Sequence, residues 1–144
     1  MGVKADSPTT LFTGDLFNIP LQESSIDVVY TSHSIEPNGG KEKELLEELY
    51  RVTGRYLVLL EPGYELASPE AKKRMEAHGY CRNLPETAKQ LGYNVIQHEL
   101  FPLAANPLNP TAITIIKKAN SFSFSKPTPL ACPCLLYTSD AADE

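Results

Sequence analysis

The sequence lacks the features that would place the protein in a membrane, in the secretory pathway or on nucleic acid. No apolar run approaches the ~20 residues that a membrane-spanning helix requires, and residues 1–10 contain one lysine and no apolar segment of a signal peptide. All 13 basic residues but only 15 of the 18 acidic ones lie in residues 1–133, which therefore carry a net charge of −2. This near balance offers no basic stripe to neutralise phosphates. We expect a cytoplasmic protein without a membrane or nucleic-acid partner.

Cysteine is also scarce. The three cysteines are Cys81, Cys132 and Cys134, and only the last two are close together. They do not form the paired spacing of a structural zinc site, so no metal is expected. The simpler interpretation is that the protein resides in a reducing compartment. Cys132 could begin a zinc-ribbon knuckle, but a linker cysteine beside foreign sequence is the favoured alternative.

The end of the chain differs in composition from the rest. Residues 134–144 resemble the in-frame translation of a sequencing adapter, and such read-through is set aside before the fold is considered. Residues 119–133 are rich in Ser and Pro, as linkers are. The sequence therefore predicts a folded part over residues 1–118, a linker over 119–133 and an artefact over 134–144.

Short β-prone runs alternate with helical patterns along residues 10–118. Strands are predicted at 10–13, 26–32, 56–60, 94–101 and 111–117. The runs at 26–32 and 56–60 are apolar enough to be buried on both faces of a parallel sheet.

Three helices are predicted between these strands. The first starts at Lys41, and Gly54 is expected to end it. Its apolar stripe consists of Leu45, Leu46, Leu49 and Val52. The second is capped by Ser68 and stops at Gly79, and the third runs from Pro85 to Gly92. The order of elements predicts an α/β fold with a mainly parallel sheet and an antiparallel edge hairpin at its C-terminal side.

Three stretches in this order resemble class I S-adenosylmethionine-dependent methyltransferases. They are Gly14-Asp15-Leu16 with Ile19-Pro20, Ile26-Asp27-Val28-Val29 through Glu36, and Leu46 through Glu61-Pro62-Gly63. The resemblance covers residues 10–118. It implies the C-terminal part of a Rossmann-like methyltransferase domain, with S-adenosylmethionine as the cofactor.

The resemblance implies cofactor contacts at two places. The Asp15 carboxylate would accept a hydrogen bond from the adenine amino group while the Leu16 N–H faces a ring nitrogen, a pairing that suits both groups. Thr31 and Ser32 lie where a strand of the family meets the cofactor, in keeping with ligand binding beyond strand carboxyl ends. Taken alone, Asp15 could instead belong to a turn that closes a strand, and Thr31 and Ser32 could be ordinary loop caps.

The resemblance places three further residues near the methyl acceptor. His33 and Glu36 could act as a catalytic base and an orienting carboxylate, and Glu61 is placed for substrate contact. Methyl transfer often needs only proximity and desolvation, so all three could equally be ordinary loop residues. His78 and His98 are interpreted as structural.

The sequence departs from the family in two respects. One is that the second strand of the family, whose terminal acidic residue holds the ribose hydroxyls, is missing. A Gly-x-Gly-x-Gly turn, which forms the main cofactor loop of the family, occurs nowhere in the chain. We therefore expect a methyltransferase fragment that acts on a small-molecule acceptor in its parent protein but is inactive, with weak or no cofactor binding, in this form. The alternative is a non-catalytic α/β interaction module. A nicotinamide enzyme ranks below both, because the dinucleotide fingerprint is absent as well.

Overall fold

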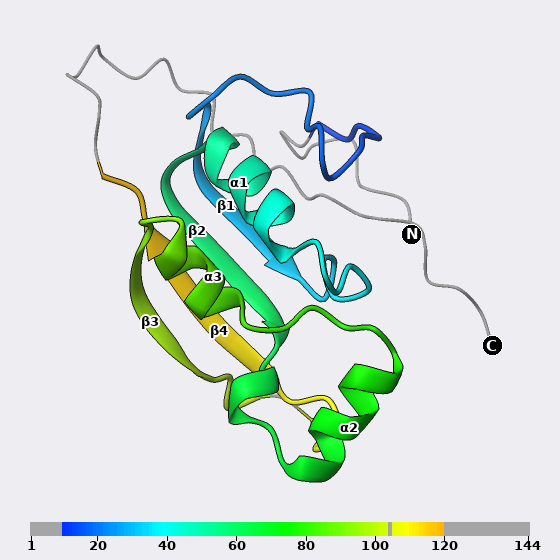
Figure 1. Ribbon diagram of the computed structural model, residues 1–144. Coiled ribbons are helices and arrows are strands. Elements are labelled where there is room, and N and C mark those ends of the chain that lie inside the picture. Colours follow the sequence, from blue (N-terminus) through cyan, green and yellow to red (C-terminus); the bar gives the residue numbers. More distant parts are fainter. Residues whose placement is uncertain (1–9, 104, 120–144) are drawn as a thin grey trace.

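The computed structural model describes residues 10–103 and 105–119 (Figure 1). Its elements are β1 (Ile26–Ser32), α1 (Glu42–Val52), β2 (Thr53–Pro62), the short 3-10 helix η1 (Tyr64–Leu66), α2 (Pro69–Ala77), α3 (Leu84–Gln90), β3 (Asn94–Leu100) and β4 (Thr111–Lys117). The predictions for Cys132, Cys134 and the segment 134–144 lie outside the described residues. Of the predicted linker, only residue 119 is described.

The sheet is mixed, and the prediction of a mainly parallel sheet is wrong. Its strand order is β1-β2-β4-β3, in which β1 runs parallel to β2 while β4 is antiparallel to both β2 and β3. The expected antiparallel pairing of the last two strands is confirmed. However, β4 inserts between β2 and β3 instead of remaining at the edge, and this insertion creates the second antiparallel pair.

The predicted strand at residues 10–13 is absent. The only bridge described before β1 joins Asp15 to Asn18. Backbone groups form a strand when a neighbouring strand accepts and donates their hydrogen bonds, and no described strand lies beside residues 10–13. Composition alone therefore gave the wrong result there.

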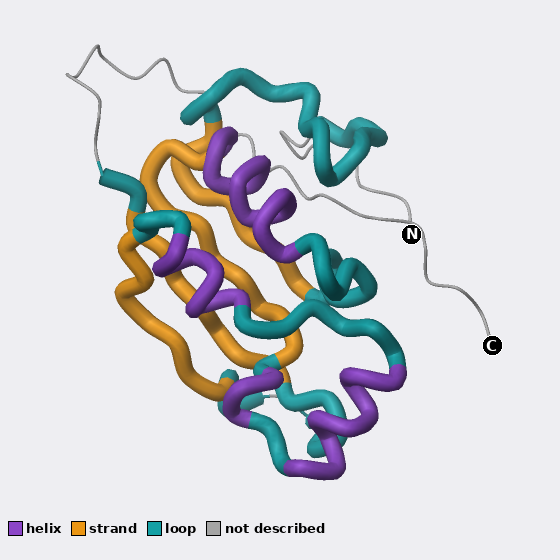
Figure 2. The backbone as a smooth tube through the Cα atoms, in the orientation of Figure 1, coloured by secondary structure: helices purple, strands orange, loops and turns teal. Residues whose placement is uncertain are grey.

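Within the described part, helices cover one face of the sheet. Figures 1 and 2 show α1 and α3 side by side over the strands, with α2 beyond the end of the sheet. On the helix side, Val29 and Leu57 are buried. Val28 and Tyr30, which flank Val29 in β1 and point to the opposite face of the sheet, are 51% and 41% exposed. The prediction that β1 is buried on both faces is therefore wrong.

The apolar stripe of α1 is confirmed. Each of its four residues is at most 1% exposed, and they are Leu45, Leu46, Leu49 and Val52. Gly54 does not end the helix as predicted, because the Thr53 hydroxyl donates to the Leu49 carbonyl at 2.7 Å and the chain turns directly into β2. Gly54 lies inside β2, where a Cβ atom would come within 3.1 Å of the Ser24 carbonyl oxygen.

The N-terminal cap of α2 is also confirmed. The Ser68 Oγ accepts a hydrogen bond from the backbone N–H of Ala71 at 3.2 Å, and Pro69 occupies the first helical position. Ser68→Ala is expected to lower the free energy of unfolding by about 1 kcal/mol, because this N–H loses its acceptor. Urea unfolding measures the effect, and Ser68→Asn, which keeps a capping oxygen, serves as the control. Equal stability of the alanine variant and the wild type would contradict the role of the cap.

Candidate functional site

Polar side chains from three parts of the fold meet at the carboxyl ends of β1 and β2. His33, the first residue after β1, has a backbone φ of +49°, in the left-handed region that non-glycine residues seldom adopt. Its Nδ1 contacts the Glu36 carboxylate, and its Nε2 lies 2.8 Å from the Thr111 hydroxyl at the start of β4. This strained conformation, together with the polar contacts of the imidazole, makes the corner the candidate site.

Glu36 orients His33 electrostatically. The hydrogen bond to Glu36 raises the pKa of His33 above its usual value, against the opposing effect of burial. Burial of Glu36 disfavours its charged form, but the interactions with His33, Tyr80 and Asn109 outweigh burial and lower its pKa. The Asn109 Nδ2 donates to the same carboxylate oxygen at 3.4 Å. The result is a charge-assisted pair whose imidazole is held in one orientation.

Glu61, near the end of β2, is buried close to this pair. Its side chain is 2% exposed, and its Oε1 accepts a hydrogen bond from the backbone N–H of Ser34 at 3.2 Å. Burial raises the pKa of Glu61 to about 7, although the Thr31 hydroxyl and His33 favour the charged form. Its Oε2 has no hydrogen-bond partner in the described part of the chain. Glu61 thus anchors the loop after β1 and retains one oxygen for a further donor.

The residues predicted to bind the cofactor occupy two different environments. Asp15 is exposed, and its Oδ1 accepts a hydrogen bond from the Phe17 N–H at 2.9 Å. The Leu16 side chain is buried in the core, whereas its backbone N–H has no hydrogen-bond partner among residues 10–103 and 105–119. Thr31 is buried and Ser32 is exposed at the end of β1.

The segment that carries Asp15 is fastened to α1. The backbone N–H of Ile19 donates to Glu48 Oε1 at 2.6 Å, and Arg51 donates to the carbonyls of Ile19 and Leu21 at 2.9 and 2.8 Å. At the start of α1, the Lys41 ammonium lies 5.1 Å from the centre of the Phe17 ring. The segment from Phe17 to Leu21 therefore runs along α1, with Phe17 near the start of the helix.

The two predicted cofactor corners are not joined by a hydrogen bond in the described part of the chain. Within the described residues, no hydrogen bond connects Asp15 or Leu16 with Thr31 or Ser32. A cofactor role for these four residues stays a prediction.

Three residues of the site were missed by the sequence analysis. Tyr80, Asn109 and Thr111 contact the His33–Glu36 pair, yet Asn109 and Thr111 are 73 and 78 positions away from their partners in the chain. Sequence periodicity carries no signal for side-chain contacts across such distances.

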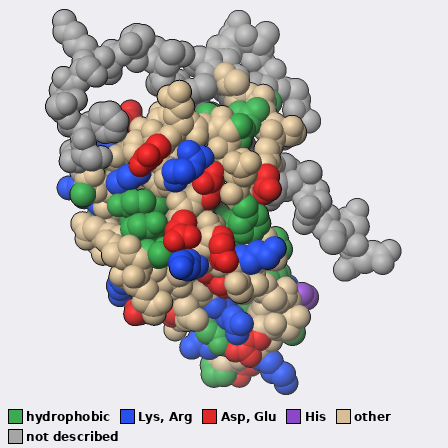
Figure 3. All heavy atoms as spheres, turned by 45° about the horizontal axis from the view of Figure 1, so that its top comes forward, with side chains coloured by type: hydrophobic (Ala, Val, Ile, Leu, Met, Phe, Trp, Pro, Cys, Tyr) green, Lys and Arg blue, Asp and Glu red, His purple; other side chains and the backbone are tan. Residues whose placement is uncertain are grey.

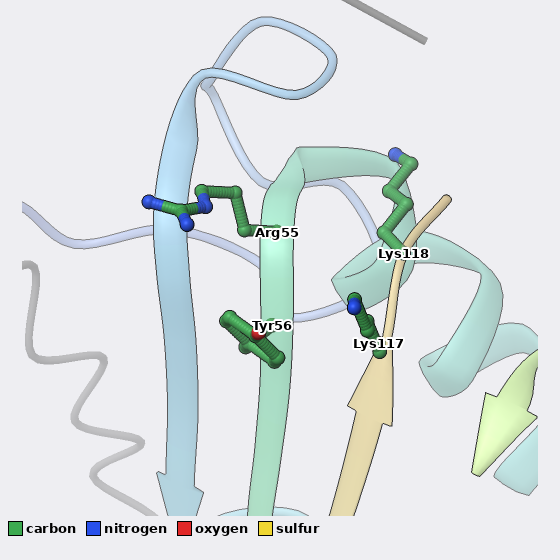
Figure 4. A pocket seen from close by; sticks show the side chains of 4 residues that line it. All are labelled: Arg55, Tyr56, Lys117 and Lys118. Atoms are coloured by element: carbon green, nitrogen blue, oxygen red, sulfur yellow. The ribbon is translucent and has the colours of Figure 1, made fainter. Parts of the chain in front are cut away.

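A shallow hollow of about 90 Å³ at the opposite end of the sheet is less suited to a ligand. It is lined by Arg55, Tyr56, Lys117 and Lys118. Figure 4 shows the charged ends of Arg55, Lys117 and Lys118 well apart from one another. The Lys118 ammonium already donates to the Tyr50 carbonyl at 2.8 Å and to the Ser24 hydroxyl at 3.1 Å. These cations do not converge on one anion.

A larger hollow of about 180 Å³ lies between α1 and α3 and is lined by Lys43, Thr87, Gln90 and Leu91, none of which the sequence analysis singled out as a site residue. On the face shown in Figure 3, acidic and basic side chains are intermingled. In residues 10–103 and 105–119, no group of three or more His, Cys, Asp or Glu side chains is arranged to hold a metal ion. None of the helices in the same residues is long and apolar enough to cross a membrane.

The architecture is a methyltransferase-like α/β fold. A solved structure that supports this class is a SAM-dependent methyltransferase from Methanosarcina mazei, which superposes with a TM-score of 0.54 at 14% sequence identity. The match covers 74% of this chain but only 66% of the length of that protein. No protein-family model and no curated protein sequence matches the chain. At this level of identity, the likeness extends to the fold.

Proposed function

We propose that the chain contains part of an S-adenosylmethionine-dependent methyltransferase site that acts on a small-molecule acceptor. The observation that carries the proposal is the His33–Glu36 pair, which is held at the carboxyl edge of a methyltransferase-like sheet. Ligands of open α/β folds bind at this edge. If His33 acts as a base, the methyl acceptor is a molecule with an O–H or N–H group that the imidazole can deprotonate.

The Asp15 turn has the chemistry to recognise an adenine edge. Asp15 Oδ1 is occupied by the Phe17 N–H, which leaves Oδ2 as an acceptor for the exocyclic amino group. The adjacent N–H of Leu16, which has no partner among the described residues, would face a ring nitrogen. Thr31 and Ser32 would bound the other side of the cofactor. S-adenosylmethionine supplies an electrophilic methyl group when it is bound.

The orientation of His33 suits a general base. When Nδ1 carries the proton and donates it to Glu36, the lone pair of Nε2 faces the Thr111 hydroxyl. A methyl-accepting substrate whose O–H or N–H group replaces this hydroxyl could then transfer its proton to Nε2. Glu36 stabilises the imidazolium that results. Glu61, predicted to contact substrate, is buried, and it would instead support the site by holding the Ser34 N–H of the loop that carries His33. Because Glu36 raises the pKa of His33, the base is free only above this raised value, and transfer should quicken as the pH rises through it.

Cofactor affinity should be weak in this chain. The sequence contains no Gly-x-Gly-x-Gly turn, and the chain spans 66% of the methyltransferase to which it is similar. We infer that the residues present supply the adenine and acceptor sides of the site, while a parent protein would supply the remaining cofactor contacts.

Titration with S-adenosylhomocysteine tests this proposal. Amide chemical shifts of Asp15, Leu16, Thr31 and Ser32 are expected to move together, with a dissociation constant well above the micromolar range. Asp15→Asn keeps the oxygen that binds the Phe17 N–H but places an amino group where Oδ2 lies, so these shifts should disappear. Asp27→Asn, an exposed change on β1, is the matched control.

Two results would overturn parts of the proposal. Micromolar affinity would show that the glycine-rich loop is not needed. Absence of any shift at saturating ligand would remove the cofactor role and favour the non-catalytic interaction module.

A further inference from the structure

We infer that Tyr80 and Asn109 are positioning residues that hold Glu36 against Nδ1 of His33. The inference rests on the proposed role of His33 as a base. Neither residue belongs to the loop that carries the pair: Tyr80 follows α2, and Asn109 lies in the connection before β4. The two side chains reach Glu36 from segments that are remote from it in sequence.

The loop after β1 is fastened to the segment around Tyr80 by two backbone hydrogen bonds. The Cys81 N–H donates to the Glu36 carbonyl at 2.8 Å, and the Gly39 N–H donates to the Gly79 carbonyl at 3.0 Å. Gly39 approaches so closely that a Cβ atom on it would lie 2.4 Å from the Gly79 oxygen. Tyr80 is thereby fixed beside Glu36 whether or not the phenol contributes.

Two donors then act on the Glu36 side chain. The Asn109 Nδ2 lies 3.4 Å from Oε2, the oxygen that also contacts His33. The Tyr80 hydroxyl interacts with the same carboxylate and favours its ionised form. On its other side, the Tyr80 ring packs against the Arg74 guanidinium, whose Cζ is 5.9 Å from the ring centre, and against the His78 ring at 5.4 Å. A contact chain therefore runs from α2 through Tyr80 to His33.

Free rotation of Glu36 would weaken its hold on His33. The charged groups that act on His33 are Glu36 in its own loop and Glu61 on β2. Arg74 acts on Tyr80, and the His78 ring stacks against the Tyr80 ring. If Tyr80 and Asn109 fix the carboxylate, their loss lets it turn toward solvent. The pKa of His33 then falls, and the tautomer with the proton on Nε2 gains population.

Nitrogen-15 NMR of the histidine ring, followed through a pH titration, tests the inference without cofactor or acceptor. Tyr80→Phe and Asn109→Ala are each expected to lower the pKa of His33 and to raise the population of its Nε2-protonated tautomer. Gly39→Ala should produce the same change, because the added Cβ pushes the Gly79–Tyr80 backbone away from Glu36. Tyr30→Phe removes a phenol from an exposed position on β1 and should change neither quantity.

Each outcome has a definite meaning. An unchanged His33 in Tyr80→Phe and Asn109→Ala would show that both residues only pack, and an increased pKa would show that they merely withdraw charge from Glu36; either result overturns the inference. A lowered pKa in a chain that shows no S-adenosylhomocysteine binding would retain the inference and remove the proposed cofactor role instead.

Discussion

Glu61→Gln is expected to make the protein less sensitive to pH between about pH 4 and pH 8. Burial raises the pKa of Glu61 from 4.5 to about 7. Both the folded and the unfolded chain hold this proton at low pH. As the pH rises from 4.5 toward 7, the unfolded chain releases it while the folded chain retains it, so the free energy of unfolding falls and then levels off. This fall amounts to about 3 kcal/mol in wild type.

Urea unfolding at both ends of this pH range measures the effect. Glutamine keeps an oxygen for the Ser34 N–H and carries no titrating proton, so Glu61→Gln should gain about 3 kcal/mol relative to wild type between low and high pH. Glu47→Gln changes an exposed glutamate on α1 and should follow the wild-type curve. A constant difference between Glu61→Gln and wild type across the range would mean that Glu61 ionises as readily in the folded chain as in the unfolded one.

Leu49→Ala is expected to cause a large loss of stability. Leu49 is fully buried in the cluster that joins α1 to the sheet and to the segment containing Leu16 and Ile19. Removing its buried methyl and methylene groups leaves a cavity, with a cost of about 2–5 kcal/mol. Because the helix also fastens the Asp15 segment through Glu48 and Arg51, the same change should loosen this segment.

Chemical denaturation measures the loss of stability, and amide hydrogen exchange at Ile19 and Leu21 reports the loosening. Leu103→Ala provides a control of identical chemistry, since Leu103 is 80% exposed and should change stability by less than about 0.5 kcal/mol. Similar effects of the two substitutions would show that α1 does not form the centre of the core.

Local features of the fold followed from the sequence because their causes lie within a few residues. The spacing of Leu45, Leu49 and Val52 puts them on one face of a helix, whatever that face packs against in the folded protein. Ser68 before Pro69 sets the start of α2, and Gly79, with a φ of +67°, follows its end. The secondary-structure predictions were wrong where the result depends on another segment of the chain. Residues 10–13 have no described strand to pair with, and Gly54 lies in β2 because the helix already ends at Thr53.

Some residues of the candidate site were predicted from the sequence, and others were found only in the structure. The sequence singled out His33 and Glu36, which share one short loop and contact each other. It gave no indication of Tyr80, Asn109 or Thr111, and it did not reveal that Glu61 is buried. These properties depend on the placement of β4 between β2 and β3 and on the close approach of Gly39 to Gly79.

The sequence by itself determined the helices, the cap at Ser68 and the residues around which a site could form, because hydrophobic period and capping act over one or two turns of chain. Only the tertiary structure decided the strand order, the face left without a described helix and the partners of His33 and Glu36. Those depend on contacts between residues far apart in the chain, whose formation is governed by packing and by hydrogen bonding between strands.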